Sequence, residues 1–525
     1  INNTIVGGLA GDALTTGGNN TAIGKNALSS EDANSYNVAV GTNALNTLNA
    51  GADGYNVAVG YDAGGLMSTG VNNVLAGGLA GDALTTGSYN VAIGHEALST
   101  EDAHGRNVAI GHRALKDLNA GADGYNVAVG FDAGTNLTTG ANNVILGAVA
   151  GDALTTGTDN IAIGIGALGA EDGHGLNIAI GTNALTTLDA GAQGHNVAIG
   201  YNAGTAMTTG LNNTLIGNYA GDALTTGSQN VAVGNGAFGS ANGSEGKNVA
   251  IGYDALNAMD ADGDAYNVAI GHSAGKAVST GVRNTIVGGL AGDALTTGTD
   301  NTAMGHQALG GEDTGTKNTA VGSYALQDLN YDGAGYNTAI GYVAGQDIST
   351  GRYNVIVGAH AGDSMTSGEY NVALGYNALA GEDAHGRNVA IGTNALAVQD
   401  AGADGYNIAI GHNAGLSVTT GVKNNIIGGL AGDAITTGQA NEVMGYNALT
   451  ANTEGSYNVA IGQSTLSANV LGSKSIGIGY AALGSQNPAS AVDMYNISIG
   501  HSAGQAMTTG LYNTIVGGLA GDALT

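Results

Sequence analysis

Acidic side chains recur at fixed places in this sequence, and they are its candidate ligands for a metal ion. They fall into single aspartates and Glu-Asp pairs: Asp82, Asp152, Asp222 and Asp293, and Glu101-Asp102, Glu171-Asp172 and Glu382-Asp383. Ca²⁺ prefers oxygen ligands, so the four single aspartates are candidate Ca²⁺ ligands, and no other cofactor is expected. Equivalent residues would lie about 19 Å apart in a stack of repeats, too far to share an ion. A solvated acidic surface that keeps the protein soluble is the simpler interpretation.

Other residues with chemical potential do not form a catalytic pattern. Gly164–Gly169 matches G-x-G-x-x-G, but no helix is expected to follow it, so dinucleotide binding is not indicated. The 11 histidines are scattered; His95 and His112 follow equivalent glycines and are expected to stack on each other. No Ser/His/Asp set recurs. We therefore expect no catalytic residues and no enzyme activity.

Tyrosine is common, with 22 residues, and it falls at two places in the repeat. Tyr36 and Tyr125 stand just before the repeated asparagine, whereas Tyr61 and Tyr201 stand just after the repeated glycine. Rows of exposed tyrosine could stack on sugars. Alternatively, the tyrosines cover the edges of the coils.

The element that positions all these residues is a five-residue unit, Asn-Val-Ala-Ile-Gly, as at Asn107–Gly111. It occurs in thirty versions, almost always 17 or 19 residues apart. Such a period indicates a solenoid, in which stacking supplies the core that no single coil has. The unit is too short and too β-branched for a helix. We expect parallel coils about 4.8 Å apart, each with two short strands and two bends; the second strand would include His112–Leu115.

Two positions of the unit have predicted structural roles. Asn opens 29 of the thirty units, Ser475 being the exception, and stacked Asn side chains can hydrogen-bond along the axis. The first of these ladder asparagines are Asn3, Asn20, Asn37, Asn56, Asn90, Asn107 and Asn126. The closing glycine lets the backbone turn with positive φ, as at Gly7, Gly24, Gly41, Gly60, Gly94 and Gly111.

A longer period of about 70 residues groups the coils in fours. These super-repeats begin near residues 3, 73, 143, 213, 284, 354 and 424, and the last, 424–512, contains an extra coil. The strand's middle residue is large in the first coil of each, as at Ile145, and usually Ala elsewhere. Ala-Gly then replaces Ala-Leu in the next segment, which would keep the core volume constant. The sequence thus predicts one all-β parallel solenoid domain over 1–525.

Composition excludes several classes of function. The net charge is −29 although only 10% of residues are charged, which argues against nucleic-acid binding and against docking on anionic membranes. No apolar run is long enough to insert in a membrane. The chain has no Cys, so disulfides and thiolate metal sites are excluded. Residues 513–525 repeat residues 3–15, so we expect a window of a longer repetitive chain.

The repeated unit resembles two groups of known repeats. Asn-Val-Ala-Ile-Gly-x-x-Ala-Leu is similar to the head repeats of trimeric autotransporter adhesins, which form left-handed parallel β-rolls as trimers. Asn337–Gly345, which reads Asn-Thr-Ala-Ile-Gly-Tyr-Val-Ala-Gly, resembles repeats of some phage tail fibres and other bacterial surface proteins. The resemblance implies a homotrimeric, non-enzymatic fibre with an adhesive or spacer role.

We accordingly expect an extracellular structural fibre on a cell or virion surface, acting as a stiff adhesive rod or spacer. Its partners would be further copies of itself, as a homotrimer or filament, and a cell-surface glycan or protein receptor. A phage tail fibre for host recognition and a self-assembling extracellular filament are the alternatives. A polysaccharide-active β-helix enzyme would need carboxylates clustered on one face, and the uniform loops argue against it.

Overall fold

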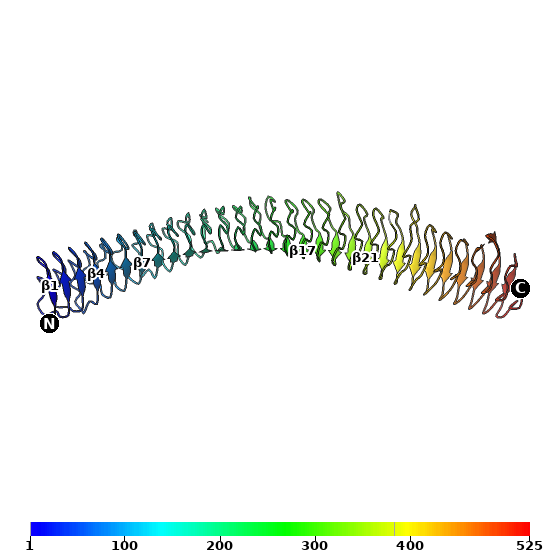
Figure 1. The fold of residues 1–525 in the computed structure, drawn as a ribbon, viewed down its shortest axis with the longest axis horizontal. Helices are drawn as coiled ribbons and strands as arrows, with labels where there is room; N and C mark the ends of the chain where they lie inside the picture. The colour runs from blue at the N-terminus through cyan, green and yellow to red at the C-terminus, as the bar shows by residue number, and fades with distance from the viewer. Residues whose placement is uncertain (1, 383) are drawn as a thin grey trace. The chain divides into compact units, whose positions relative to one another are not determined.

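The computed structural model describes residues 2–382 and 384–525, and within them the only regular elements are short β-strands. The chain divides into two compact units, Ile1–Tyr266 and Asn267–Thr525, which are described separately. Each unit is a parallel β-solenoid with one main strand per coil (Figure 1). The predicted fold class is therefore confirmed. A single domain over 1–525 stays a prediction.

The strands of unit 1 are all three residues long. They are β1 (Thr4–Val6), β2 (Thr21–Ile23), β3 (Val38–Val40), β4 (Val57–Val59), β5 (Val74–Ala76), β6 (Val91–Ile93), β7 (Val108–Ile110), β8 (Val127–Val129), β9 (Val144–Leu146), β10 (Ile161–Ile163), β11 (Ile178–Ile180), β12 (Val197–Ile199), β13 (Thr214–Ile216), β14 (Val231–Val233) and β15 (Val249–Ile251).

Unit 2 repeats the pattern and adds two two-residue strands. Its strands are β16 (Val268–Ile270), β17 (Thr285–Val287), β18 (Thr302–Met304), β19 (Thr319–Val321), β20 (Thr338–Ile340), β21 (Val355–Val357), β22 (Val372–Leu374), β23 (Val389–Ile391), β24 (Ile408–Ile410), β25 (Asn425–Ile427), β26 (Glu442–Met444), β27 (Val459–Ile461), β28 (Gly472–Ser473), β29 (Ile476–Ile478), β30 (Val492–Asp493), β31 (Ile497–Ile499) and β32 (Thr514–Val516). The short pair β28 and β30 lies in the irregular last super-repeat and is parallel as well.

Within each unit, the strands of successive coils pair in parallel and in register. Val108, Ala109 and Ile110 of β7 face Val127, Ala128 and Val129 of β8. Side chains alternate along a strand, so Ala109 points into the coil and is fully buried, whereas Val108 and Ile110 point outward. Figure 1 shows the strands of each unit stacked along one side of the coils, with the loops on the other.

The second segment of each coil is not a strand, so the prediction of two strands per coil is wrong. Arg113 and Leu115 have positive φ, 53° and 48°, and alternating left-handed residues curl the chain instead of extending it. The segment still bonds to the neighbouring coils: the Arg113 N–H donates to the His95 carbonyl and the Leu115 N–H to the Ala133 carbonyl, both at 3.0 Å. This curl closes the coil around Ala114 and Leu115, which are fully buried.

The core keeps its volume as the sequence predicts. The large Ile145 of β9 lies between two glycines, Gly134 and Gly151, of its own and the preceding coil. A Cβ on Gly134 would lie 2.8 Å from Ile145 Cδ1, and a Cβ on Gly151 would lie 3.6 Å from the same atom. Glycine at these two places therefore makes the room that the isoleucine occupies. Across the described ranges no helix has the length and hydrophobicity needed to cross a bilayer.

The glycine that ends each strand permits the next coil to approach. Gly111 has φ of 137°, a conformation that side chains rarely adopt, and a Cβ on it would overlap the carbonyl group of Gly130 in the following coil. All six predicted turn glycines have φ between 132° and 145°.

Replacing this glycine is expected to loosen the stack locally. Gly111→Ala should destabilise β7 and β8 by about 3 kcal/mol or more, because both the backbone conformation and the contact with Gly130 are lost. Hydrogen–deuterium exchange should show faster exchange of the β7 and β8 amides. Gly121→Ala is the matched control, since Gly121 has an ordinary φ and open space around its Cβ position. Equal exchange in the two variants would contradict this account.

Candidate functional site

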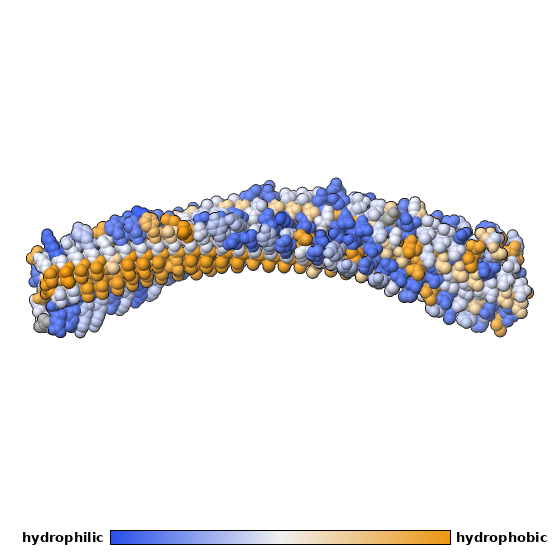
Figure 2. Space-filling model, in the orientation of Figure 1, coloured by the Kyte–Doolittle hydropathy of each residue, from blue (hydrophilic) through white to orange (hydrophobic). Residues whose placement is uncertain are grey.

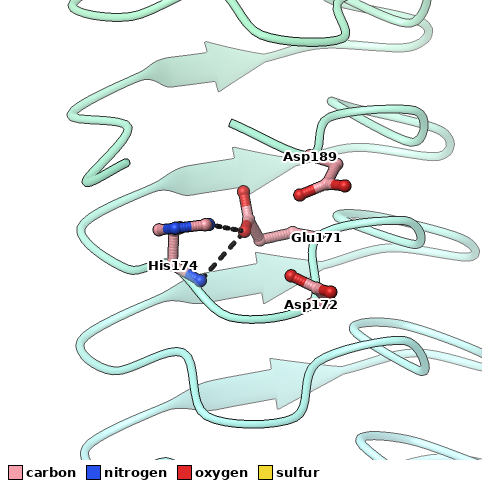
Figure 3. A group of neighbouring side chains, drawn as sticks. All are labelled: Glu171, Asp172, His174 and Asp189. Carbon is pink, nitrogen blue, oxygen red and sulfur yellow. Dashed lines mark hydrogen bonds and ion pairs between the residues drawn. The ribbon is translucent and has the colours of Figure 1, made fainter. Parts of the chain in front are cut away.

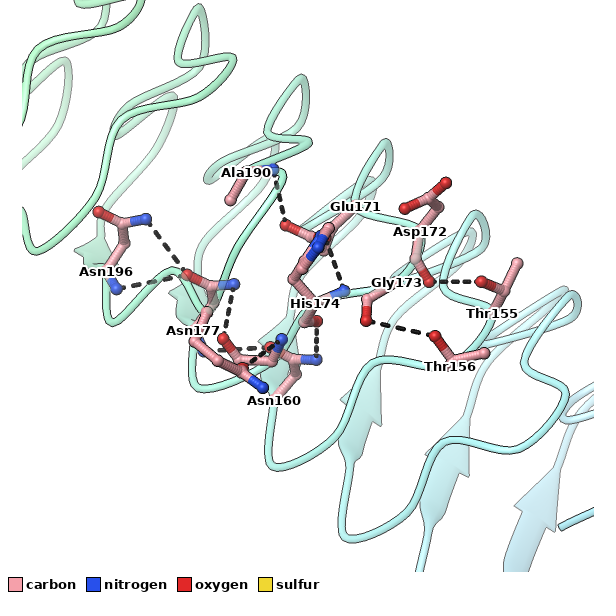
Figure 4. A network of polar contacts seen from close by, with 12 residues as sticks. Thr155, Thr156, Asn160, Glu171, Asp172, Gly173, His174, Asn177, Ala190 and Asn196 are labelled. Carbon is pink, nitrogen blue, oxygen red and sulfur yellow. Dashed lines mark hydrogen bonds and ion pairs between the residues drawn. The ribbon is translucent and has the colours of Figure 1, made fainter. Parts of the chain in front are cut away.

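Within each unit, hydrogen bonds join most ladder asparagines to those of the neighbouring coils, in the interior of the coils. The Asn107 N–H donates to Asn90 Oδ1 at 3.1 Å, and the Asn126 N–H donates to Asn107 Oδ1 at 3.2 Å. The column starts at Asn3, whose Oδ1 accepts the N–H of Asn20 at 2.8 Å. Side-chain bonds of the kind predicted from the sequence accompany these contacts in many coils, as where Asn126 Nδ2 donates to Asn107 Oδ1 at 3.3 Å. The amide groups lie stacked coil on coil (Figure 4).

Many ladder asparagines also close their own coil, whereas others, such as Asn107, donate to the carbonyl two residues earlier. Asn126 Nδ2 donates to the carbonyl of Gly140 at 2.9 Å, fourteen residues later. Asn can do both because its amide carries an acceptor and donors. At Ser475 the shorter side chain is supplemented by Gln486, whose Nε2 donates to Ser475 Oγ at 2.9 Å and whose Oε1 accepts from Asn496 at 3.0 Å. The amides of Asn126 and Gln486 thus hold the coil through their hydrogen bonds.

The acidic loops are organised by one buried glutamate. We call Glu31, Glu101, Glu171, Glu312 and Glu382 the loop glutamates; each is fully buried. Glu171 Oε1 accepts the N–H of His174 at 3.0 Å, and its Oε2 accepts the N–H of Ala190 in the next coil at 3.2 Å (Figure 4). Glu101 makes the same bonds to His104 and Ala120. The carboxylate therefore supports its own loop and the next one.

Three loop glutamates gather further potential metal ligands. Glu171 lies with Asp172, His174 and Asp189 within 4.8 Å, and His174 Nδ1 is 3.2 Å from Glu171 Oε1 (Figure 3). The other two groups are Glu101, Asp102 and His104, and Glu382, His385 and Asp400. These histidines were not among the predicted ligands, although the spacing Glu-x-x-His recurs at 101, 171 and 382. Since the Glu171 carboxylate already accepts two backbone N–H bonds, the arrangement is accounted for by loop structure.

The candidate Ca²⁺ ligands do not join these groups. Asp82, Asp152, Asp222 and Asp293 occupy equivalent loops of successive super-repeats, and burial raises the pKa of each carboxyl. Asp82 lines a shallow pocket of about 190 Å³ together with Asp62, Asn43 and Asn46. Asp383, from the third Glu-Asp pair, lies outside the described residues.

The tyrosines before the ladder asparagines stack on their neighbours. The rings of Tyr36 and Tyr55 are 4.9 Å apart between centroids and within 3° of parallel. Where Arg106 replaces tyrosine, its guanidinium lies 5.6 Å from the ring centres of both Tyr89 and Tyr125. Ring faces used in this way are not free to stack on sugars, so the rows fit the role of covering coil edges better.

A second aromatic row follows the strand glycines. His95 stacks on His112 at 5.6 Å, as predicted, and His112 on Phe131 at 5.1 Å. This row and the tyrosine row run along the two sides of the strands.

Between the two rows lies an apolar surface, the strand face, made by the first and third residues of the three-residue strands. The third residue is apolar in every one of these strands, and the first is Val, Ile or Thr except at Asn425 and Glu442. Among the described residues Glu442 is the only charge on this face, in a protein of net charge −29. Yet the side chains remain part-exposed, with Val129 at 37% and Ile93 at 38%. Figure 2 shows an unbroken hydrophobic band over the strands of unit 1.

The strand face is large enough to be an interaction surface. With about a third of each of its two side chains exposed per coil, unit 1 alone presents roughly 600–1,200 Å² of apolar area. Patches above a few hundred Å² usually mark interaction sites. The arrangement also has the anatomy of a protein interface, an apolar centre with Tyr, Arg and His at the rim.

Comparison with models of known protein families gave no match, and comparison with curated proteins gave none either.

Removing a ladder asparagine should be costly although it lies far from any pocket. Asn126→Ala leaves the Gly140 carbonyl and the Asn143 N–H, which bonds Asn126 Oδ1 at 3.0 Å, without partners. Two buried unsatisfied groups should cost about 2–5 kcal/mol, seen as faster amide exchange in β8 and β9. Asn136→Ala, in the same coil but exposed, is the control and should leave exchange there unchanged.

Stability should fall as pH rises, because burial raises the pKa of Glu312 to about 7 from an ordinary value near 4.5. The folded state then keeps a proton between these values that the unfolded state releases. This contribution is complete below pH 4.5 and is lost by pH 7, and it amounts to at most about 3 kcal/mol.

Thermal unfolding of the wild type and of Glu312→Gln at pH 4.5 and pH 8 measures this contribution. As pH rises, the unfolding temperature of the wild type should fall relative to that of Glu312→Gln, because glutamine does not titrate. A difference in unfolding temperature that is independent of pH would show that Glu312 does not carry the effect.

Proposed function

We propose that this chain is a non-enzymatic structural fibre of a cell or virion surface, built from copies that associate through their strand faces. The observation that carries the proposal is the strand face: its third strand position is apolar in every three-residue strand, the face is nearly free of charge, and its side chains are part-exposed. Such a surface gains free energy only when an apolar partner covers it.

A second copy of the same chain is the partner that fits best. Its strand face has the same spacing of about 4.8 Å between coils, so side chains of one copy can fit between those of another along many coils. The area presented by unit 1 is comparable to the roughly 800 Å² per partner of a stable interface. Homotrimers and filaments both satisfy this geometry, and the resemblance to adhesin heads favours the trimer.

The acidic loops fit the same function. Repeated carboxylates on the loop side keep separate assemblies apart and soluble, while the strand faces hold copies together. The loop glutamates and ladder asparagines are engaged in backbone hydrogen bonds, which supports a structural role over a catalytic one. A spacer or adhesive fibre needs this uniformity along its length. Adhesion to a glycan or protein receptor and a tail-fibre role in host recognition remain alternatives within the same proposal.

The test is the mass of the protein in solution with and without charges on the strand face. Light scattering of the wild type should give a multiple of the 51.0 kDa chain. Replacing Val57, Val91, Val127 and Ile161 by Glu puts a charge on every second coil and should raise the dissociation constant at least tenfold, since unpaired charges would be buried. Glu442 occupies this position naturally, so the fold tolerates the change.

The matched control replaces the same four residues by Thr, which stands there naturally at Thr302 and Thr319. This variant should stay associated, and circular dichroism should be the same for all three proteins. A wild type with the mass of one chain at every concentration would refute self-association. Equal dissociation constants for the Glu and Thr variants would show that copies associate elsewhere.

A further inference from the structure

The tyrosines that precede the ladder asparagines form a column with an unusual local geometry. Twelve tyrosines stand at this position: Tyr36, Tyr55, Tyr89, Tyr125, Tyr266, Tyr336, Tyr353, Tyr370, Tyr406, Tyr457, Tyr495 and Tyr512. All have positive φ, so their backbone conformation is the same in every coil. The asparagines that follow are held by the hydrogen bonds of the ladder, so the tyrosine side chains leave the coils at equivalent points.

Where two successive coils both carry tyrosine here, the rings stack. The centroid distances are 4.9 Å for Tyr36–Tyr55, 5.5 Å for Tyr336–Tyr353, 4.9 Å for Tyr353–Tyr370 and 5.5 Å for Tyr495–Tyr512. All four pairs are within 11° of parallel. The rings are also accessible, with exposed fractions from 38% at Tyr353 to 72% at Tyr512.

This geometry brings equivalent ring carbons together. In parallel rings related by one coil step, each ortho carbon lies about one centroid separation from its counterpart. Bond formation requires the rings to rotate toward each other, and their exposure at the surface leaves them free of core packing that would oppose this rotation. The backbone of the two coils stays in place through the asparagine ladder.

We propose that the stacked tyrosine pairs are sites of oxidative cross-linking, in which tyrosines of successive coils join as dityrosine. The oxidant is a one-electron oxidising system such as a haem peroxidase with hydrogen peroxide. Each phenol loses an electron and a proton, and the two radicals form a carbon–carbon bond between ortho carbons. The hydrogens on those carbons then move to the phenol oxygens. In total, two tyrosines lose two hydrogen atoms and one peroxide becomes two waters.

The product is a covalent link between neighbouring coils. Tyr36–Tyr55 closes a loop over one 19-residue step, and Tyr353–Tyr370 closes one over a 17-residue step. A short link of this kind restricts the unfolded chain and leaves the folded stack nearly unchanged. The chain has no cysteine, so tyrosine is its means of covalent reinforcement under oxidising conditions. This inference does not depend on self-association, because each pair lies within one chain.

The structure provides internal controls. Tyr89 and Tyr125 belong to the same column but are separated by Arg106, whose guanidinium lies between them. Tyr201 and Tyr219 are 5.4 Å apart, as close as the stacked pairs, but their rings meet edge to face at 79°. The first pair should not couple, and the second should couple less than Tyr36–Tyr55.

The experiment treats the dilute full chain with horseradish peroxidase and hydrogen peroxide, then maps cross-linked peptides by mass spectrometry and dityrosine fluorescence. We expect intrachain links at the four stacked pairs, each lowering the mass by two hydrogens, and a higher unfolding temperature. Tyr36→Phe should remove the Tyr36–Tyr55 link alone, and Tyr353→Phe should remove both links that involve Tyr353. Tyr125→Phe should change none of them.

The same treatment in urea gives the pattern of tyrosine cross-links that forms in the unfolded chain. Identical link patterns in buffer and in urea would overturn the proposal, as would links that form only between chains or a Tyr89–Tyr125 link as abundant as Tyr36–Tyr55. Absence of dityrosine in the folded protein would overturn it too. Because these changes are at exposed rings, circular dichroism should confirm that each variant keeps the wild-type fold.

Discussion

Every coil in this protein must accept a copy of itself at a distance of about 4.8 Å, and this constraint governs each position of the repeat. At the strand end only glycine fits, because a Cβ on Gly111 would overlap the carbonyl group of Gly130. At the position that opens each unit, the residue must donate a hydrogen bond to one neighbouring coil and accept one from the other. Asparagine meets this need with its backbone N–H and its side-chain oxygen: the Asn107 N–H donates to Asn90 Oδ1, and Asn107 Oδ1 accepts from the Asn126 N–H. The two most regular residues of the sequence are thus the two for which stacking leaves least choice.

The same constraint explains where the charges lie. A carboxylate repeated in every coil would stand about 4.8 Å from its copies and repel them strongly. The loop glutamates instead recur at intervals of four or eight coils, at least about 19 Å apart, which exceeds the screening length at physiological salt. Each is buried against backbone N–H groups, as Glu171 is against His174 and Ala190. The acidic residues that first suggest a metal site are therefore placed where a stack can hold them.

The repeat pattern of the sequence predicted the features that recur in every coil or super-repeat. These are the strand, its parallel neighbours, the glycine turn, and the large Ile145 compensated by Gly134 and Gly151. The pattern did not predict the left-handed residues Arg113 and Leu115, since neither residue type favours positive φ and only the closing of the coil imposes it. Nor did it identify His174 beside Glu171, because the equivalent residue is Asn34 in one super-repeat and Gly315 in another. The side-chain bonds predicted between stacked asparagines are present, as from Asn126 to Asn107, but the sequence did not show that the backbone N–H of Asn126 donates to the same oxygen.

Stacking restricts the residue type less on the strand face than at the glycine and asparagine positions. Stacking alone would permit any residue on an outward position, and Thr302, Asn425 and Glu442 show that the fold accepts polar ones. Nevertheless the third strand position is apolar in every three-residue strand. Each of these side chains exposes too little area to contribute much by itself. Apolar residues are nevertheless kept at all these positions, although each contributes little. The proposed self-association explains this, because many weak contacts would add up along one interface. If copies associate through this face as proposed, the association should tolerate single changes, whereas a single substitution in the glycine or asparagine columns should destabilise the fold directly.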